Sequence, residues 1–441
     1  MPDTVGLDYR EPTSLRGIAN KARHQKSHRF GNLYRELNAA LLRKAWHRLN
    51  KSSASGIDKV SAYAYEQDLE ANIADLVCRL KNKGYKAKLV RRKYIPKANG
   101  KQRPLGIPAV EDKLLQTAVS MLLEAIFEPD FQRCSFGYRP KVGARDAVQA
   151  LGFNLQYRPF GYVVEADIRG FFDHLDHAWL KTMLRQRIAD EAFIGLIDKW
   201  LKAGILEPDG SIHYPEAGSP QGGVVSPVLA NIYLHYALDL WFEKVVKRHC
   251  KGKAMLVRYA DDFVAAFQYR AEAEAFYRVL AKRLGKFGLE VALEKTQLLR
   301  FSRFHPSRKR TFVFLGFEFY WDLDRKGERR LKRRTSRVKM KRALKDFTAW
   351  VKTHRHVPTL QLFAAVTRKL RGHYNYFGLP GNSRSISEYH RKVLAIFFKW
   401  LQRRSRRHRM NGWRFYELVE RLRLPGPKIV PYPRHKSLVL V

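Results

Sequence analysis

Two short apolar runs, separated by a pair of adjacent aspartates, are the feature that most constrains how this chain folds. Residues 254 to 267 read Ala-Met-Leu-Val-Arg-Tyr-Ala-Asp-Asp-Phe-Val-Ala-Ala-Phe, and both runs favour strands. Neighbouring side chains on a strand point to opposite faces, so Asp261 and Asp262 reach one ion together only if the backbone turns between them. The pattern predicts a hairpin with carboxylates at its bend. Taken alone, the pair fits either a solvated turn or a site for a hard cation such as Mg²⁺.

A third carboxylate occupies a similar place in another apolar segment. Gly161-Tyr-Val-Val-Glu-Ala-Asp167 predicts a short strand that ends at Asp167, and Gly170 then permits a bend. One aspartate at a strand end and two at a hairpin suit two ions about 3.5–4 Å apart, which activate an attacking hydroxyl and stabilise a leaving phosphate. We therefore expect the three aspartates to converge in the folded chain.

These segments resemble the palm of reverse transcriptases, with Tyr259-Ala-Asp-Asp262 as the Tyr-X-Asp-Asp box. The resemblance implies that Asp167 and Asp261 are the main ligands of two Mg²⁺ ions and that Asp262 assists. Ser219-Pro-Gln-Gly-Gly-Val-Val-Ser-Pro-Val-Leu-Ala-Asn-Ile-Tyr-Leu234 closely resembles the corresponding motif of the group II intron-encoded members. In that motif Gln221 is implied to lie near the incoming nucleotide.

Two basic residues match the fingers of the same family. Lys97 and Arg103 lie in Ile95-Pro-Lys97 and Gln102-Arg-Pro-Leu-Gly-Ile-Pro108, on either side of a predicted hairpin turn. By resemblance they neutralise the triphosphate, a role that suits one point charge and one forked guanidinium. As isolated residues they would be ordinary solvated cations.

Three further positions match motifs of the family. Phe172 falls where reverse transcriptases keep an aromatic ring that clashes with a ribose 2′-hydroxyl and so selects deoxynucleotides, although the sequence fits a core phenylalanine equally well. Lys295, in Leu293-Glu-Lys-Thr296, is implied to donate a proton to the departing pyrophosphate. Phe314-Leu-Gly-Phe317 resembles the primer grip and predicts a short strand interrupted at Gly316.

The charge of the chain points to a polyanionic partner. The 84 Lys and Arg residues against 41 Asp and Glu give a formal net charge of +43, which is self-repulsive unless phosphates neutralise it. Residues 325–345 hold 12 cations and one anion. Apolar positions repeat through and beyond this segment, which predicts a helical bundle with a basic groove. Leu370-Arg-Gly-His-Tyr-Asn-Tyr-Phe377 then resembles the thumb of intron maturases, called domain X.

Cysteine and hydropathy patterns exclude other classes. The three cysteines have no Cys-x-x-Cys spacing, so neither a disulfide framework nor a zinc module is indicated. No apolar run of 18 residues and no signal peptide is present, which predicts a cytoplasmic protein without membrane contact. The sequence ends at residue 441 without the Cys-bearing His-Asn-His endonuclease that many intron proteins append. We therefore expect any mobility to need a primer from elsewhere.

Apolar periodicity predicts the remaining elements. Helices are expected over residues 62–84, 111–127, 177–206 and 228–246, and residues 131–140 form an aromatic, arginine-bearing loop that lines nucleic acid or simply turns. Leucines at helical spacing predict a basic helical lead-in before residue 60; they are Leu33, Leu37, Leu41 and Leu42.

The combined interpretation is an α/β right-hand polymerase. We divide it into a basic helical extension (1–60), fingers and palm (61–318), a helical thumb or domain X (319–405) and a basic tail (406–441) that is a candidate DNA-binding segment. The predicted activity is RNA-directed DNA synthesis by a group II intron protein that also binds intron RNA to assist splicing and mobility. Its predicted partners are intron RNA as template, a DNA primer or target, and deoxynucleoside triphosphates. The sequence does not specify an oligomeric state.

Two other functions remain open from the sequence. One is a splicing maturase whose polymerase activity is secondary or lost, and the basic segment at residues 325–345 motivates it. The other is a reverse transcriptase adopted by its host for repair or antiphage defence. Primer extension separates the first from a polymerase, and intron RNA domains flanking the reading frame would argue against the second.

Overall fold

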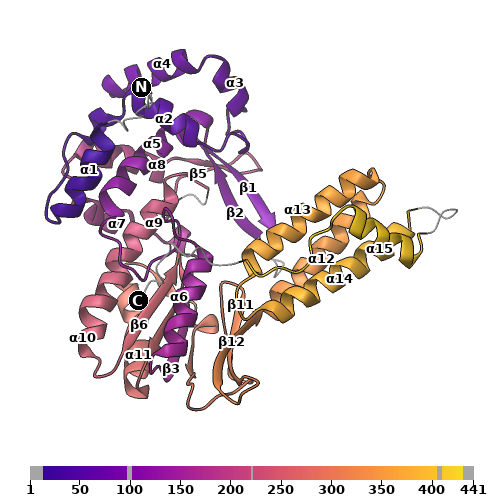
Figure 1. Cartoon of the computed structure of the whole chain (residues 1–441). Helices are drawn as coiled ribbons and strands as arrows, with labels where there is room; N and C mark the ends of the chain where they lie inside the picture. Colours follow the sequence, from indigo (N-terminus) through magenta and orange to yellow (C-terminus); the bar gives the residue numbers. More distant parts are fainter. Residues whose placement is uncertain (1–12, 97–101, 220–221, 405–409, 431–441) are drawn as a thin grey trace, which may run out of the picture.

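The structure is a computed structural model that describes residues 13–96, 102–219, 222–404 and 410–430. Figure 1 shows an N-terminal helical region at the top, a central sheet below it, and a group of C-terminal helices at the right. No helix in the described part of the chain is long and apolar enough to cross a membrane.

The central sheet is antiparallel and carries the predicted hairpin. Its order is β6 (Ala254–Tyr259), β7 (Asp262–Phe267) and β3 (Tyr162–Arg169). Two further strands pair with β3, namely β8 (Glu290–Val291) near its C-terminal end and β9 (Gln297–Arg300) along its N-terminal half. The expected strand and hairpin are confirmed, but β3 runs two residues beyond Asp167 before the chain bends at Gly170.

A long apolar helix covers one face of this sheet. It begins with α9 (Ser226–Leu234) and continues through two π-helical turns, η3 (His235–Asp239) and η4 (Phe242–Val246), to α10 (Lys247–His249). Helix α11 (Arg270–Gly285) lies beside it. The helix expected over residues 228–246 is therefore present, with π segments that the sequence pattern did not indicate. Such segments are uncommon and often occur at functional sites.

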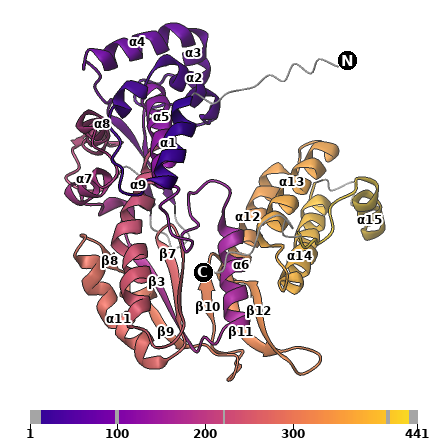
Figure 2. The ribbon, with the colours of Figure 1, turned by 60° about the vertical axis from the view of Figure 1, so that its left-hand side comes forward.

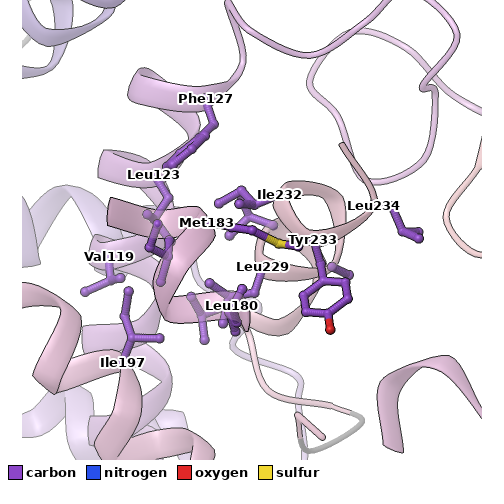
Figure 3. Close-up of a cluster of buried hydrophobic side chains, with 14 of the residues drawn as sticks. Val119, Leu123, Phe127, Leu180, Met183, Ile197, Leu229, Ile232, Tyr233 and Leu234 are labelled. Atoms are coloured by element: carbon purple, nitrogen blue, oxygen red, sulfur yellow. The ribbon is translucent and has the colours of Figure 1, made fainter. Parts of the chain in front are cut away.

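The same apolar core extends upward into a bundle of helices around α5 (Val110–Phe127). Sixteen of the 18 residues of α5 are buried, because neighbouring helices surround it. Figure 3 shows side chains of α5 packed against those of α7 (His177–Arg185), α8 (Glu191–Leu201) and α9. The helix expected over residues 111–127 is confirmed. The helical structure expected over residues 177–206 is present as two separate helices, α7 and α8, but residues 205–206 form strand β4 (Ile205–Leu206).

The N-terminal region is built from short helices and a small sheet. The helices are α1 (Thr13–His24), η1 (Leu33–Glu36), α2 (Ala39–Arg48), α3 (Ala62–Gln67) and α4 (Leu69–Lys81). The four leucines expected to pack are all buried. Strands β1 (Val90–Pro96) and β2 (Gln102–Ile107) form the predicted hairpin and join β4 and β5 (Ile212–His213) in the order β2-β1-β4-β5. The continuous helix expected over residues 62–84 is instead two helices that meet at Asp68.

The other face of the central sheet packs against α6 (Ala144–Tyr157) and a second, three-stranded sheet. That sheet consists of β10 (Phe312–Phe314), β11 (Phe317–Leu323) and β12 (Arg329–Thr335), and its aromatic side chains fill the core between the layers. Figure 2 shows α6 and this sheet on the side opposite α11. Helical structure expected from residue 319 onward is therefore wrong for residues 319–335, because these residues pair with one another as strands β11 and β12.

The C-terminal helices have a core of their own. They are α12 (Arg337–His354), α13 (Thr359–Phe377), α14 (Ser383–Gln402) and α15 (Gly412–Arg421), joined by apolar side chains of all four helices. Ser336 begins α12 by accepting a hydrogen bond from the amide of Lys339. The expected helical bundle is thus present from residue 337.

Candidate active site

The structure places two predicted site residues directly opposite each other in the central sheet. Asp167 of β3 is the cross-strand partner of Asp262, the first residue of β7. Directly opposed side chains in an antiparallel pair have Cβ atoms about 4.5–5.5 Å apart, and like charges in that position repel. Asp261 precedes Asp262 in the two-residue turn that joins β6 to β7. The three aspartates expected to converge are therefore brought together.

Repulsion and burial change the acidity of this cluster. Burial, followed by the charges of Asp167, Asp261 and Glu165, raises the pKa of Asp262 to about 8. Burial and the charge of Asp167 also raise the pKa of Asp261. Glu165, two residues before Asp167 on the same strand face, is a fourth acidic group, whose pKa burial raises. The site is thus a concentration of carboxylates with too little positive charge around it.

Lys295 supplies part of the missing positive charge. It belongs to the short helix η5 (Leu293–Lys295), and its ammonium group forms an ion pair with the Asp167 carboxylate. Hydrogen bonding to Asp167 raises the pKa of Lys295, which keeps the ammonium charged. The predicted proton donor therefore lies at the site, where it neutralises a carboxylate.

The donor set suits a hard divalent cation. Carboxylate oxygens are preferred ligands of Mg²⁺, and a cation between repelling carboxylates lowers their electrostatic energy. Within the described ranges, however, no group of three or more His, Cys, Asp or Glu is close enough to enclose an ion. The acidic cluster fits a cation in its chemistry, while the expected two-ion cage is not assembled in this arrangement.

A buried arginine fixes the turn that carries Asp261. Arg258 is fully buried and forms a two-bond ion pair with Asp239 of η3, with N–O distances of 2.7 and 2.6 Å. Its Nη1 donates to the Asn231 side chain at 3.2 Å and to the Ala260 carbonyl at 3.0 Å. Its Nη2 also donates to the Ser135 hydroxyl at 2.7 Å. All five guanidinium hydrogens are therefore used.

Ala260 needs this support because its backbone is strained. Its φ is +55°, in the left-handed region, which residues with a Cβ adopt at a cost of about 1–2 kcal/mol. Gly137 packs against it so closely that an added Cβ would lie 2.3 Å from the Ala260 nitrogen. Asn231 in turn donates to the Gly137 carbonyl at 2.7 Å. One network thus holds both the Ala260–Asp261 turn and the loop before α6.

Phe172 lies at the edge of the same site. It belongs to η2 (Phe171–Asp173), which follows the bend at Gly170, and its carbonyl accepts a hydrogen bond from the Ser219 amide at 2.7 Å. This bond joins the predicted sugar gate to the start of the loop that resembles the family motif. Gln221 of that loop lies outside the described residues.

The loop also touches the fingers hairpin. Gly222, with φ of +117°, approaches β2 so closely that an added Cβ would lie 2.4 Å from the Gly106 carbonyl oxygen. Arg103 of β2 is the cross-strand partner of Ile95 of β1. Its charge partly offsets the rise in the pKa of Asp261, so Arg103 lies within electrostatic reach of the turn between β6 and β7. Lys97 lies outside the described residues.

The predicted primer grip is a turn rather than an interrupted strand. Leu315 and Gly316 both have positive φ and join β10 to β11. The backbone amide of Leu315 lies near the Asp262 carboxylate and partly offsets the rise in its pKa. The Leu315 carbonyl accepts a hydrogen bond from the hydroxyl of Tyr376 on α13 at 3.0 Å. The C-terminal helices are therefore linked to the acidic cluster through this turn.

The cations of the basic segment 325–345 differ in their ion pairs between β12 and α12. In β12, cations pair with acidic residues, as in Arg334 with Glu318 at 2.7 Å and Lys332 with Asp322 at 2.9 Å. On α12, by contrast, three exposed lysines form no ion pair within the described residues; they are Lys339, Lys341 and Lys345. Among the described residues, the exposed cations of this segment without an ion pair therefore include these lysines of α12 and also Arg325, Lys326 and Arg329.

Sequence reasoning missed several residues of this site. Arg258 carried a signal, since a charged residue within a buried apolar strand needs a partner, but its partner Asp239 is not identifiable from the sequence. Tyr376 lies in the segment that resembles domain X, and no role of its own was predicted for it. Tyr138 was part of the aromatic loop 131–140, without a role of its own.

Comparisons with known proteins agree with this geometry. Residues 95–319 match the family model "Reverse transcriptase (RNA-dependent DNA polymerase)". The chain is 32% identical over 308 residues to Protein YkfC of Escherichia coli, covering 63% of this chain and 78% of that protein. It is 29% identical over 405 residues to the group II intron-encoded protein LtrA of Lactococcus lactis, covering 72% of this chain and 65% of LtrA. Telomerase from Candida albicans, solved with an RNA fragment, matches 87% of this chain and 71% of that chain, with a TM-score of 0.43 at 13% identity.

The Arg258–Asp239 pair generates a stability prediction. Arg258→Met is expected to lower the free energy of unfolding by about 3–5 kcal/mol, because it leaves the Asp239 carboxylate buried without a partner. The double variant Arg258→Met with Asp239→Leu removes both charges and is expected to recover most of that loss. Denaturant unfolding monitored by circular dichroism measures both effects.

The control is an exposed ion pair of the same type. Arg270 and Glu274 are 2.8 Å apart, with 71% and 43% of their side chains exposed, so Arg270→Met is expected to change stability much less. A variant at Arg258 as mild as the one at Arg270, or a double variant no more stable than Arg258→Met, would contradict the role given to the buried pair.

Proposed function

Because the chain belongs to the reverse transcriptase family of RNA-dependent DNA polymerases, we propose that it copies group II intron RNA into DNA and also binds that RNA to assist splicing. The reaction is the attack of a primer 3′-hydroxyl on the α-phosphate of a deoxynucleoside triphosphate, directed by an RNA template. The observation that carries this proposal is the register that sets Asp167 opposite Asp262, beside the Asp261 turn.

Three aspartates of the chain are proposed to hold Mg²⁺. Bound Mg²⁺ would promote deprotonation of the primer hydroxyl and neutralise charge on the phosphates. Asp167 and Asp261 provide the main ligands, and Asp262, the cross-strand partner of Asp167, assists. Arg258 keeps the Asp261 turn in place through the Ala260 carbonyl, so ligand positions depend on a group that does not touch the substrate.

The remaining site residues are proposed to handle the nucleotide. Arg103 and Lys97 bind the triphosphate, Gln221 lies near the incoming base pair, and Phe172 rejects a 2′-hydroxyl. Lys295 is the proposed proton donor to pyrophosphate. Its ammonium must leave the Asp167 carboxylate to reach that position, and the entry of a divalent cation would compete for the same carboxylate.

We propose that the regions predicted from the sequence have separate functions. Residues 61–318 provide fingers and palm, residues 319–405 the thumb, and the basic tail from residue 406 is a candidate DNA-binding segment. A cytoplasmic location stays a prediction.

The first test is Asp261→Asn. Removing one charged ligand while keeping the shape of the side chain is expected to lower the rate of DNA primer extension on an RNA template by at least about a hundredfold. RNA binding, measured by fluorescence anisotropy, is expected to stay nearly unchanged. Asp209→Asn, in an exposed turn next to Ser211, is the matched control and should extend normally. Normal extension by Asp261→Asn would refute the ligand assignment.

The second test is removal of divalent cations. Primer extension is expected to stop in EDTA and to return when Mg²⁺ is restored, because the acidic cluster otherwise repels the triphosphate. Extension is measured with deoxynucleotides and, separately, with ribonucleotides. Undiminished synthesis in EDTA would show that the carboxylates act without metal.

A splicing role is supported by the exposed lysines of α12 and by relatives that include the group II intron-encoded protein LtrA and a nuclear intron maturase of Arabidopsis thaliana. Replacing Lys339, Lys341 and Lys345 with Gln is expected to weaken binding to a group II intron transcript. The slope of log affinity against log salt should fall by about 0.7–0.9 for each RNA phosphate that the lysines no longer neutralise.

The matched control neutralises three cations elsewhere. Arg278, Lys282 and Lys286, replaced by Gln, lie in or next to α11, on the side of the central sheet away from α12. If intron splicing and RNA affinity are the same in both triple variants, the proposed role of α12 is wrong. Primer extension on a short unstructured template provides a readout for the polymerase that does not depend on splicing.

A further inference from the structure

Tyr138 combines a strained backbone with an exposed ring. It has φ of +54°, although bulky residues rarely occupy the left-handed region, and 47% of the residue is exposed. An exposed ring contributes little to stability through burial. A strained conformation held at a catalytic site is more often part of the mechanism than of the core.

Both neighbours of Tyr138 are fixed in place. The Gly137 carbonyl accepts from Asn231, which is part of the Arg258 network. On the other side, the Arg139 guanidinium binds the Glu128 carboxylate at 2.7 Å and donates to two loop carbonyls. The backbone of Tyr138 therefore cannot relax without breaking one of these sets of bonds.

The ring of Tyr138 lies beside two aromatic rings of the candidate site. Its centroid is 6.4 Å from that of Phe172, with the planes at 71°, and 6.4 Å from that of Tyr259. Burial and the charge of Asp261 raise the pKa of its hydroxyl and the charge of Arg103 lowers it, so the hydroxyl is within electrostatic reach of both charges. Within the described residues, its hydroxyl makes no hydrogen bond.

Phe172 has a second aromatic neighbour on the core side. The ring of Phe171, which is 2% exposed, lies 5.4 Å from it at 66°. Phe172 is thus held between one buried ring and one exposed ring. A side chain that selects a sugar by steric clash must not rotate away from the added hydroxyl, and contact on one side alone leaves that rotation open.

We propose that Tyr138 is a positioning residue for sugar selection, whose ring holds Phe172 against the 2′ position of the incoming nucleotide. This inference rests on the proposed function, in which Phe172 excludes ribonucleotides. It adds that the loop between α5 and α6, fixed by the Arg258 network, determines how rigid the gate is.

The test compares kcat/KM for dCTP and CTP opposite a template guanine. An edge-to-face ring pair is worth about 0.5–1.5 kcal/mol, so Tyr138→Ala is expected to lower discrimination against CTP by about two- to tenfold. Tyr138→Phe keeps the ring and is expected to keep wild-type discrimination. Tyr63→Ala removes another exposed tyrosine, 76% exposed on α3, and is the control for a general effect. Thermal unfolding checks that each variant is folded.

A double-mutant cycle tests whether Tyr138 acts through Phe172. Because the gate is already absent in Phe172→Ala, adding Tyr138→Ala is expected to cause no further loss of discrimination. Unchanged discrimination in Tyr138→Ala, or losses that add in the double variant, would overturn the inference. Failure of wild type to incorporate dCTP, or unchanged sugar choice in Phe172→Ala, would instead overturn the proposed function on which it rests.

Discussion

The buried ion pair between Arg258 and Asp239 is the interaction on which the candidate active site depends. Both side chains are fully buried, and such a pair is tolerable only when every donor and acceptor has a partner. Here the guanidinium meets that requirement by donating to Asp239 of η3, Asn231 of α9, Ser135 in the loop before α6 and the carbonyl of Ala260 in the turn between β6 and β7. The desolvation cost of a buried charge therefore holds the helix formed by α9 and η3, the loop before α6 and the turn between β6 and β7 in one geometry.

That backbone geometry keeps the carboxylates of the acidic cluster close together although they repel one another. Asp167 and Asp262 face each other across two strands, and the charges of Asp261 and Glu165 add to the repulsion. A sheet selected for stability alone would place apolar or oppositely charged residues there. The cluster persists because the surrounding sheet is apolar on both faces and fixes the backbone, while Lys295 offsets part of the charge. Strain at Ala260 and Tyr138 is maintained in the same way, by well-packed neighbours.

The C-terminal helices are connected to the acidic cluster by a short path. The hydroxyl of Tyr376 on α13 donates to the Leu315 carbonyl, and the Leu315 amide lies near the Asp262 carboxylate. A shift of the C-terminal helices would therefore be transmitted through the Leu315–Gly316 turn to the surroundings of the Asp262 carboxylate. The basic segment is divided as well, since Lys332 and Arg334 of β12 pair with acidic residues of β11, whereas Lys339, Lys341 and Lys345 of α12 are exposed.

The sequence by itself determined the parts of this protein that depend on local pattern. The hairpin around Asp261, the strand with Asp167, the helix after residue 110 and the excess of positive charge follow from periodicity and composition, which are properties of neighbouring residues. Its resemblance to reverse transcriptases also identified the family that the comparisons confirm. Local pattern failed where long-range pairing decides the structure, as in β12, where expected helix became strand because β11 offered seven paired positions.

Only the tertiary structure decided which distant groups meet. Asp239, Asn231 and Ser135 are separated from Arg258 by 19 to 123 residues, so no spacing rule could assign them as its partners. The same holds for Lys295 on Asp167, for Tyr376 on the Leu315 turn and for Tyr138 beside Phe172. Hydrogen bonds and ring contacts act over a few ångströms in space regardless of separation along the chain, and the position of each partner is fixed only when the core has formed.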